Sequence, residues 1–517
     1  MNFFKSLLKS EPKMSGNLLA AVDLGSNSFH LIIAKAVDLE GQTKIKKIDN
    51  IKEQVRLADG LDGEKSLNLS SRMRALFCLR RFGERLRSFS PDTVRAVATN
   101  TFRIAKNSKV FLKECEEALG FPIEVISGVE EARLIYKGVA QSILSDKQKA
   151  LVIDVGGGSS EFIIGEGPRP KELESVFIGC CRLNKEFFSG KNITKNNFEK
   201  AILLARKEIQ VITAAFKKEG WDMCYGCSGT IRSIHEVCNA NGMSKDGITF
   251  QSLVRLKNNL VSIGFRSPEL LPGLKPERVA LFPGGLAILI AIFKELKIKK
   301  MELCDVALRT GVLYEVWGRS WDDDARTTTI KCLMKQYEVD TLHSNRLAQL
   351  ANLFSENMHF DGVEKNSEMN KLIEWSAMLL ELGQSISHSS YHKHSAYIIA
   401  NSEMPGFTRR EQEVMASLVL GHVGKLGKVS SFMADKSKLA ALVCLRCAAI
   451  FLRSRRDLKL PPMQLSVREG SIDLHMSSEW LMKYPLTAFT LEQEAKEWAK
   501  MKIEFCIKFN LTDEAAA

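Results

Sequence analysis

One short sequence pattern occurs twice in this chain, and it constrains the fold more than any other feature. Residues 18–29 read LLAAVDLGSNSF, and residues 150–162 read ALVIDVGGGSSEF. In each copy an apolar strand ends at an aspartate, a Gly/Ser turn follows, and a second apolar run indicates the returning strand of a hairpin. We therefore expect two related lobes of α/β structure, each presenting one such turn.

The residue types in both turns are those that bind phosphate. Glycine lets backbone N–H groups approach an anion closely, and hydroxyl groups add donors. Asp23 and Asp154 stand at the strand ends, where a carboxylate can hold Mg²⁺ that bridges phosphate oxygens. Two such loops facing each other would grip a phosphate chain. The candidate phosphate-binding residues of the two turns are Gly25, Ser26, Asn27 and Ser28, and Gly156, Gly157, Gly158 and Ser159.

Length and composition indicate a soluble protein of several domains. With 517 residues the chain is too long for one hydrophobic core, and about three or four domains are expected. A hydrophobic share of 45% is ordinary, and no run of 18 or more apolar residues is present, so we expect no transmembrane segment. The 12 cysteines lie mostly in apolar segments, as reduced thiols do, which predicts a cytoplasmic location. Residues 1–17 are interpreted as a disordered basic tail.

The charge of the chain points to an anionic partner. The formal net charge is +12 at pH 7 and the pI is near 9.0. Nucleic acid, an acidic membrane surface and polyphosphate all satisfy that charge, and so does a plain basic surface exposed to solvent. Zinc-finger and RNA-sheet aromatic signatures are absent from the sequence, so nucleic acid is not expected, whereas peripheral contact with a membrane stays open.

Hydrophobic patterning predicts the domain organisation. The first α/β lobe is expected over residues 18–136 and the second over 137–320, and from Trp321 helical periodicity dominates. Pro461-Pro462 marks a boundary between a helical domain over 321–460 and a small α+β region over 461–517. The expected strands are at 93–98 and 123–126, with two more within 463–476, and the expected helices are at 108–118, 195–218, 347–357, 369–382, 410–420 and 438–453.

A third loop, GCSGT at residues 226–230, follows an apolar stretch and precedes a helix-like segment. Its candidate phosphate ligands are Ser228, Gly229 and Thr230. Short Gly/Ser/Thr clusters are common turns, so this interpretation depends on the two aspartate loops.

The segment SGVEEAR at residues 127–133 begins a helix and contains two adjacent glutamates. Ser127 and Glu130 have the spacing of a capping box, which offers Glu130 a structural role. Glu131 has no such role, and a carboxylate at a helix start between two lobes could take a proton from water. The competing interpretation is a solvated glutamate that the helix dipole stabilises.

Two arginines are candidate phosphate ligands, Arg103 after a strand-like segment and Arg309 where the second lobe ends. Arg103 ends the segment TNTFR, where a guanidinium could bind phosphate bidentately, although a surface arginine is the commoner case. Arg309 is either a phosphate ligand or a packing salt bridge, and we favour packing. A metal site is the competing interpretation for His388, His392 and His394 and for the pairs Cys224/Cys227 and Cys444/Cys447, for which we favour buried thiols.

Taken together, the order and spacing of these motifs resemble the exopolyphosphatase/guanosine pentaphosphate phosphatase (Ppx/GppA) family, and exopolyphosphatases most. The matching segments also include RLADGL at 56–61, PGGLA at 283–287 and ALRTGVL at 307–313. The resemblance runs from about residue 18 to at least residue 424. It implies two actin/hexokinase-like (ribonuclease H-like) lobes, then a helical domain related to HD-type metal-dependent phosphohydrolases.

The resemblance also implies roles for named residues. Glu131 would be the base that activates water, and Asp154 and Glu161 would organise Mg²⁺ near the terminal phosphate. Asp23 and the residues of the three loops would hold phosphate, with Arg103 as a positive clamp. The reaction that the resemblance implies is release of terminal orthophosphate from long-chain inorganic polyphosphate. Such a site makes physical sense because positioning and charge neutralisation carry most of phosphoryl transfer.

The helical domain departs from its phosphohydrolase relatives, because Leu380-Glu381 stands where they carry a His-Asp metal dyad. We therefore expect no second metal-dependent active site. Instead, the domain is expected to bind substrate and to form a homodimer interface. The basic residues expected to line a polyphosphate path are Lys393, Arg409, Arg410, Lys425, Lys428, Arg453, Arg455 and Arg456.

Three alternatives stay open. The first keeps the site and changes the substrate to guanosine pentaphosphate (pppGpp), because HSSYHKHSAY at 388–397 is similar to the polyphosphatase branch whereas AILIAIF at 287–293 is similar to the other. The second is an actin-like kinase, against which the water-activating position of Glu131 argues. The third is a polyanion sensor without catalysis.

Overall fold

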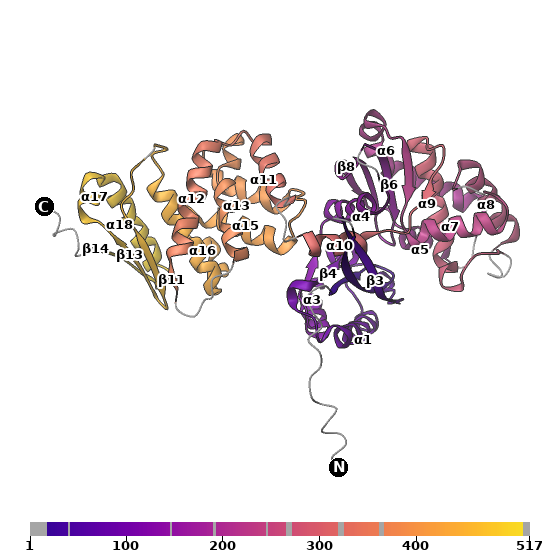
Figure 1. The fold of residues 1–517 in the computed structure, drawn as a ribbon, viewed down its shortest axis with the longest axis horizontal. Coiled ribbons are helices and arrows are strands. Elements are labelled where there is room, and N and C mark those ends of the chain that lie inside the picture. Colours follow the sequence, from indigo (N-terminus) through magenta and orange to yellow (C-terminus); the bar gives the residue numbers. More distant parts are fainter. Residues whose placement is uncertain are drawn as a thin grey trace, which may run out of the picture. The chain divides into compact units, whose positions relative to one another are not determined.

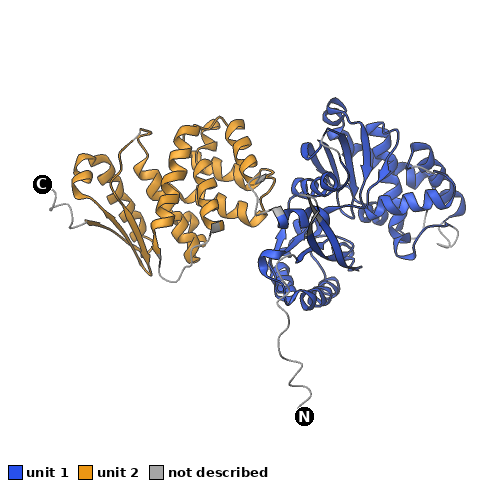
Figure 2. Ribbon diagram, viewed as in Figure 1, with its two compact units in different colours: residues 1–322 blue, residues 323–517 orange. Residues whose placement is uncertain are grey.

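The computed structural model describes residues 18–39, 42–144, 147–189, 193–244, 247–264, 271–318, 325–360, 367–456 and 458–509. The tail expected at residues 1–17 lies outside these ranges. The chain forms two compact units, residues 1–322 and 323–517, which Figure 2 shows in blue and orange.

The first sheet of unit 1 is built around the first predicted hairpin. Its central strand β1 (Leu18–Leu24) pairs antiparallel with β2 (Phe29–Leu39) and parallel with β4 (Val94–Ala98). The strand order is β3-β2-β1-β4-β5, with β3 at Gln42–Glu53 and β5 at Ile123–Val125. Helices α1 (Leu69–Leu86) and α3 (Ser108–Leu119) share a buried core with this sheet, and the short α2 spans Asn100–Ile104.

The second sheet repeats this plan strand for strand. β6 (Lys149–Val155) pairs antiparallel with β7 (Ser160–Glu166) and parallel with β9 (Met223–Gly226), and the order is β10-β9-β6-β7-β8. The remaining strands are β8 (Arg169–Val176) and β10 (Glu302–Leu303). The helices of this lobe are α5 (Cys180–Phe187), α6 (Lys195–Glu219), α7 (Gly229–Ala240), α8 (Phe250–Ile263) and α9 (Phe282–Leu296). The duplicated sequence pattern therefore corresponds to a duplicated sheet topology (Figure 1).

Two helices that cross each other join the two lobes. α4 (Gly128–Ile143) follows the first sheet yet packs on β7 and β8, and α10 (Leu308–Gly318) follows the second sheet yet packs on β1. They cross in close contact, since a Cβ on Gly311 would lie 1.7 Å from the carbonyl oxygen of Leu134. The expected boundary at residue 136 falls inside α4, and the finer division into domains stays a prediction.

α9 is the most apolar helix of the second lobe. With the short turn before it, it forms a segment (Pro276–Leu296) that is long and apolar enough to span a membrane, the only such segment in the described ranges. Of its most apolar window, 78% is buried, and its residues from Phe282 to Phe293 all lie in the core of the lobe. A helix that is apolar all round suits a position covered on every side by protein.

Unit 2 begins with helices and ends with a four-stranded sheet. Its hydrophobic core is continuous across Pro461-Pro462, because Leu465 and Trp498 belong to the same cluster as Leu347 and Phe451. The hairpin expected within 463–476 is present as β12 (Gln464–Arg468) and β13 (Ser471–Met476), whereas β11 (His359–Phe360) and β14 (Glu504–Phe509) were not expected. The helices are α11 (Ala325–Gln336), α12 (Thr341–Asn357), α13 (Ser367–Met378), α14 (Tyr391–Asn401), α15 (Arg409–Gly421), α16 (Lys436–Phe451), α17 (Ser478–Lys483) and α18 (Pro485–Ala499). The strand order of this sheet is β11-β12-β13-β14. Two α/β lobes followed by a helical region confirm the expected fold.

Candidate functional site

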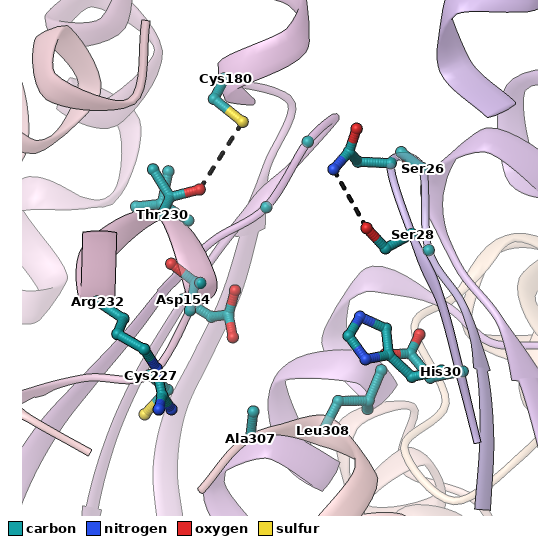
Figure 3. Close-up of a pocket in the computed structure, with 18 of the residues that line it drawn as sticks. Ser26, Ser28, His30, Asp154, Cys180, Cys227, Thr230, Arg232, Ala307 and Leu308 are labelled. Atoms are coloured by element: carbon teal, nitrogen blue, oxygen red, sulfur yellow. Dashed lines mark hydrogen bonds between the residues drawn. The ribbon is translucent and has the colours of Figure 1, made fainter. Parts of the chain in front are cut away.

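Strand alternation aims the two motif aspartates at one cavity. On β1, Val22 and Leu24 contribute to the core under α1 and α3, whereas Leu19 and Ala21 contribute to the core shared with α4 and α10. Asp23 continues this second set, because side chains alternate between the faces of a strand. Asp154 does the same on β6. Both aspartates therefore line a cavity of about 490 Å³ between the lobes, shown in Figure 3.

The two glycine loops approach each other at this cavity. A Cβ on Gly157 would lie 3.3 Å from the Cβ of Ser26, and a Cβ on Gly158 would lie 2.6 Å from Oδ1 of Asn100. The hydroxyl of Thr101 donates to Oγ of Ser26 at 2.8 Å, which anchors the first loop. In Figure 3, Ser26 and Ser28 face Asp154 across the hollow. All the candidate loop residues line the cavity: Gly25, Ser26, Asn27, Ser28, Gly156, Gly157, Gly158 and Ser159.

The third loop also reaches the cavity. Ser228 caps α7 by accepting a hydrogen bond from the backbone N–H of Ile231 at 3.1 Å, so its own hydroxyl proton stays available as a donor. Gly229 and Thr230 form the first turn of α7, whose dipole favours an anion there. The hydroxyl of Thr230 donates to Sγ of Cys180 at 3.8 Å, a contact that Figure 3 marks with a dashed line. The structure thus brings all three candidate loops to one cavity.

The two adjacent glutamates of α4 have different environments. Ser127 caps the helix, as expected, by accepting from the N–H of Glu130 at 3.1 Å. The Glu130 side chain does not return the bond; it is fully buried and takes two hydrogen bonds from Arg133, at 2.7 and 2.9 Å. Glu131 lines the cavity and is 9% exposed. Glu130 therefore has a structural role, and Glu131 is free to face a ligand.

Arg103 lies behind Glu131 and is not among the residues that line the cavity. Its Nη1 donates to Oε2 of Glu131 at 3.0 Å and to the carbonyl oxygen of Ile126 at 2.9 Å. Arg103, which was expected to clamp phosphate, thus bonds to Glu131 in this structure and orients its carboxylate. Burial nevertheless raises the pKa of Glu131, and the charge and hydrogen bond of Arg103 only partly oppose this shift.

The other carboxylates also have raised pKa values. Burial, partly offset by Arg309, raises the pKa of Asp23 to about 6. Burial, together with the negative charges of Glu131 and Asp23, raises the pKa of Asp154 to about 7. Glu161 is the cross-strand neighbour of Asp154 and accepts from the Ser175 hydroxyl at 2.9 Å, but it is not among the cavity-lining residues. Burial raises its pKa well above the ordinary value.

These carboxylates fit Mg²⁺ only if a ligand supplies further oxygens. In the described part of the chain, no group of three or more His, Cys, Asp or Glu side chains lies close enough to hold a metal ion. Mg²⁺ commonly binds through one or two carboxylates, with water and substrate phosphates completing its shell. Asp23 and Asp154 supply such carboxylates in the cavity. Burial and, to a smaller extent, repulsion between carboxylates raise their pKa values, and a bound divalent cation would offset both effects.

Apart from Arg309, sequence reasoning did not find the basic part of the wall. Nη1 of Arg309 lies 3.4 Å from Oδ2 of Asp23, so this arginine lines the cavity while making the salt bridge that we favoured. The guanidinium of Arg278 lies over the third loop, where a Cβ on Gly229 would be 2.2 Å from its Nη2. The other basic residues that line the cavity are His30, Lys47, Lys52, Arg232 and Lys275. Their lining positions follow from strand register and chain path, which no local motif encodes.

In unit 2, an ion-pair cluster occupies the position expected for a metal dyad in related phosphohydrolases. Nη2 of Arg455 donates to both carboxylate oxygens of Glu381, at 2.5 and 2.6 Å, and Nη1 lies 3.3 Å from Asp340. Nε2 of His343 lies 3.9 Å from Glu381. Arg455 is therefore already paired, which weakens its place among the basic residues proposed to bind polyphosphate. Cys224, Cys227, Cys444 and Cys447 are buried, free thiols.

Comparison with known proteins identifies the family. Residues 32–320 match the model of the Ppx/GppA phosphatase family, and residues 325–495 match that of Ppx/GppA phosphatase, domain III. An exopolyphosphatase structure from Cytophaga hutchinsonii is 24% identical, with a TM-score of 0.52 over 58% of this chain and 98% of that one. The structure of the Aquifex aeolicus member of the Ppx/GppA family is also 24% identical, with a TM-score of 0.50 over 59% of this chain and 99% of that one. At this identity, the likeness to these structures shows a shared fold.

Proposed function

The chain belongs to the Ppx/GppA phosphatase family, and from that premise we propose that it is an exopolyphosphatase, which releases terminal orthophosphate from long-chain inorganic polyphosphate. The observation that carries the proposal is the cavity in which two glycine loops face each other beside a buried carboxylate, Glu131. A phosphate group between such loops meets backbone N–H groups and hydroxyls from both sides.

In the proposed mechanism the loops bind the terminal phosphoryl group, and the positive charge of Arg309 offsets part of its charge. Glu131 accepts a proton from the attacking water. Its raised pKa suits this role, because a base with a pKa nearer the working pH transfers protons more effectively than an ordinary carboxylate. Arg103 keeps the carboxylate in place by its hydrogen bond to Oε2. The shortened chain leaves with the bridging oxygen, and orthophosphate is the product.

Asp23 and Asp154 are proposed to hold Mg²⁺ together with the phosphate oxygens of the substrate, with Glu161 as a neighbouring carboxylate. When bound, Mg²⁺ would neutralise charge on those oxygens. Ser175 donates to Glu161 at 2.9 Å and so orients the carboxylate next to Asp154.

The lining of the cavity favours a linear polyanion over a nucleotide. Among its described lining residues, His30 is the only one with an aromatic ring, and the wall contains no Phe, Tyr or Trp on which guanine could stack. Its six lysine and arginine side chains, which share the lining with six carboxylates, instead match a chain of phosphates. Guanosine pentaphosphate remains the alternative substrate.

The test is Mg²⁺-dependent release of orthophosphate from long-chain polyphosphate and from guanosine pentaphosphate, measured side by side with the full chain and its Glu131→Gln variant. We expect faster release from polyphosphate and its loss in the variant. Faster release from the nucleotide would support the alternative substrate, and release from neither would contradict both.

A further inference from the structure

A second cavity, of about 450 Å³, lies at the opposite edge of the second sheet from the phosphate loops. It is formed where two helices lead into two strands. α6 ends at Glu219 and is followed by Gly220–Asp222 and β9, whereas α9 ends at Leu296 and is followed by Lys297–Met301 and β10. α6 packs against α9, and β9 pairs in parallel with β10, so the two connections run side by side.

The rim of this cavity is basic. Four lysines line it, against two carboxylates, those of Asp222 and Glu302. Only Lys300 is paired, with Glu302 at 3.4 Å; the other three make no ion pair with any residue that the structure describes. The four lysines are Lys217, Lys297, Lys299 and Lys300.

Helix dipoles do not account for all of this charge. A lysine in the last turn of a helix, such as Lys217, is favoured by the negative C-terminal end. Lys299 and Lys300, however, lie beyond the end of α9. The buried residues Ile298 and Met301 hold this connection on the lobe, while the lysines between and beside them are exposed.

Lys297 also adopts a strained backbone conformation. Its φ of 55° and ψ of 43° place it in the left-handed region, where glycine is the usual residue after a helix. A residue with a Cβ costs about 1 kcal/mol or more in this conformation. The connection thus carries strain at the position where it presents an ammonium group to the cavity.

An indole ring completes the lining. Trp221 is half-buried against the core of the lobe, and its Nε1–H has no hydrogen-bond partner among the described residues. Met223 and Leu296 add apolar surface beside it. A flat aromatic surface next to unpaired cations suits a ligand with a planar ring and several phosphates.

We propose that this cavity, the Trp221 pocket, binds a nucleoside polyphosphate, with the base against Trp221 and the phosphates on the lysines of the Lys297–Lys300 connection. The pocket is separate from the phosphate-loop cavity. On the proposed function, the two cavities therefore bind different anions: phosphate chains without a base in the cavity between the lobes, and a phosphorylated nucleoside in the Trp221 pocket of the second lobe.

Isothermal titration of the full chain with ATP, in EDTA to prevent hydrolysis, tests this proposal. The Lys297→Ala/Lys299→Ala and Trp221→Leu variants should each raise the Kd of ATP about tenfold or more. The matched control is Lys200→Ala/Lys207→Ala, which removes the same charge from exposed positions on α6 outside the pocket. It should leave the Kd unchanged.

Inorganic tripolyphosphate separates the contributions of the ring and of the charges. Its binding should weaken in the double-lysine variant but not in Trp221→Leu. Unchanged ATP binding in the double-lysine variant would assign ATP to the phosphate-loop cavity and overturn the proposal. An equal loss in the control, or no ATP binding at millimolar concentration, would also overturn it. Thermal unfolding of each variant checks that the lobe is folded, and the double-lysine variant decides if Trp221→Leu does not fold.

Discussion

Across the hairpin of the first sheet, paired residues form the row Asp23, His30 and Lys52, whereas the equivalent row of the second sheet is Asp154, Glu161 and Ser175. The strands have the same order and directions, so the two aspartates occupy the same place in each lobe. Their neighbours differ in charge. The first row lies beside Arg309 and Arg278. Burial is the main cause of the lowered pKa of His30, and the positive charges of these two arginines lower it further. The second row gathers carboxylates and has raised pKa values.

The comparison teaches that two lobes can share one sheet topology and still differ in the charge of the side chains beside their loops. A duplicated sheet supplies two loops that face each other, and the cross-strand row beside each loop is basic in one lobe and acidic in the other. In the proposed function, the basic row of the first sheet therefore supports the phosphate chain and the acidic row of the second sheet supports the cation, while Glu131 on α4 accepts the proton.

The largest effect is expected from removing Glu131, whose negative charge acts on Asp23, Asp154 and Glu161 alike. Glu131→Gln should lower the kcat of orthophosphate release about 10²–10⁴-fold, the usual range for a general base. Steady-state release from polyphosphate measures it.

Glu130→Gln is the matched control on the same turn of α4. It breaks a buried pair with Arg133, so it should lower stability by about 3–5 kcal/mol, seen in thermal unfolding. Full turnover in Glu131→Gln would remove Glu131 from the role of base.

The next largest effect is on the Mg²⁺ requirement, and it should differ between the variants of the two aspartates. Asp154→Asn should raise the Mg²⁺ concentration for half-maximal activity about 10–100-fold, the range for weakened metal sites. Asp23→Asn should raise it less, because Arg309 already offsets the charge of Asp23. Mg²⁺ titrations of both variants measure it, and equal shifts would mean that the acidic row has no special part in holding the cation.

A smaller effect should follow when Lys52, the third residue of the first row, is replaced by serine, the residue type at the third position of the second row. Lys52→Ser should raise the KM for polyphosphate about 3–10-fold and weaken its salt dependence, with kcat unchanged, because rim charges act mainly on encounter. Lys46→Ser, on the same strand but outside the cavity, is the control. Identical KM values for the two variants would contradict a basic role for the first row.

The smallest effect concerns stability without divalent cations. Folding raises the pKa of Asp154 from its ordinary value of 3.8 to about 7, so between these pH values the folded state binds more protons than the unfolded state. Stability from this group is present below pH 4 and is lost as pH rises through 7. At pH 8, Asp154→Asn should therefore be more stable than the parent, by on the order of 1 kcal/mol after solvent screening.

Thermal unfolding in EDTA at pH 4 and pH 8 measures this difference, which should vanish at the lower pH. Asp23→Asn should show a smaller gain, because its pKa is raised only to about 6. A variant less stable than the parent at pH 8 would contradict the raised pKa.

Several site features could be predicted because they are local. The glycine loops, the cap at Ser127 and the distinct place of Glu131 follow from short motifs whose geometry depends on neighbouring residues. Arg103 shows where this reasoning stops. Its position after a strand predicted that it lies near the cleft, but only the packed structure shows that its Nη1 is bonded to Glu131 and Ile126.

What the sequence by itself determined is the repeated strand, aspartate and glycine turn, and with it the two lobes and the loop residues that line the cavity between them. Strand period and glycine geometry act over a few residues, so the amino acids alone encode them. The tertiary structure decided which distant groups meet these loops. His30 and Lys52 reach Asp23 through strand register, and Arg309 reaches it because α10 crosses back to β1 past α4. Such meetings depend on the packing of the whole lobe pair, which no single segment specifies.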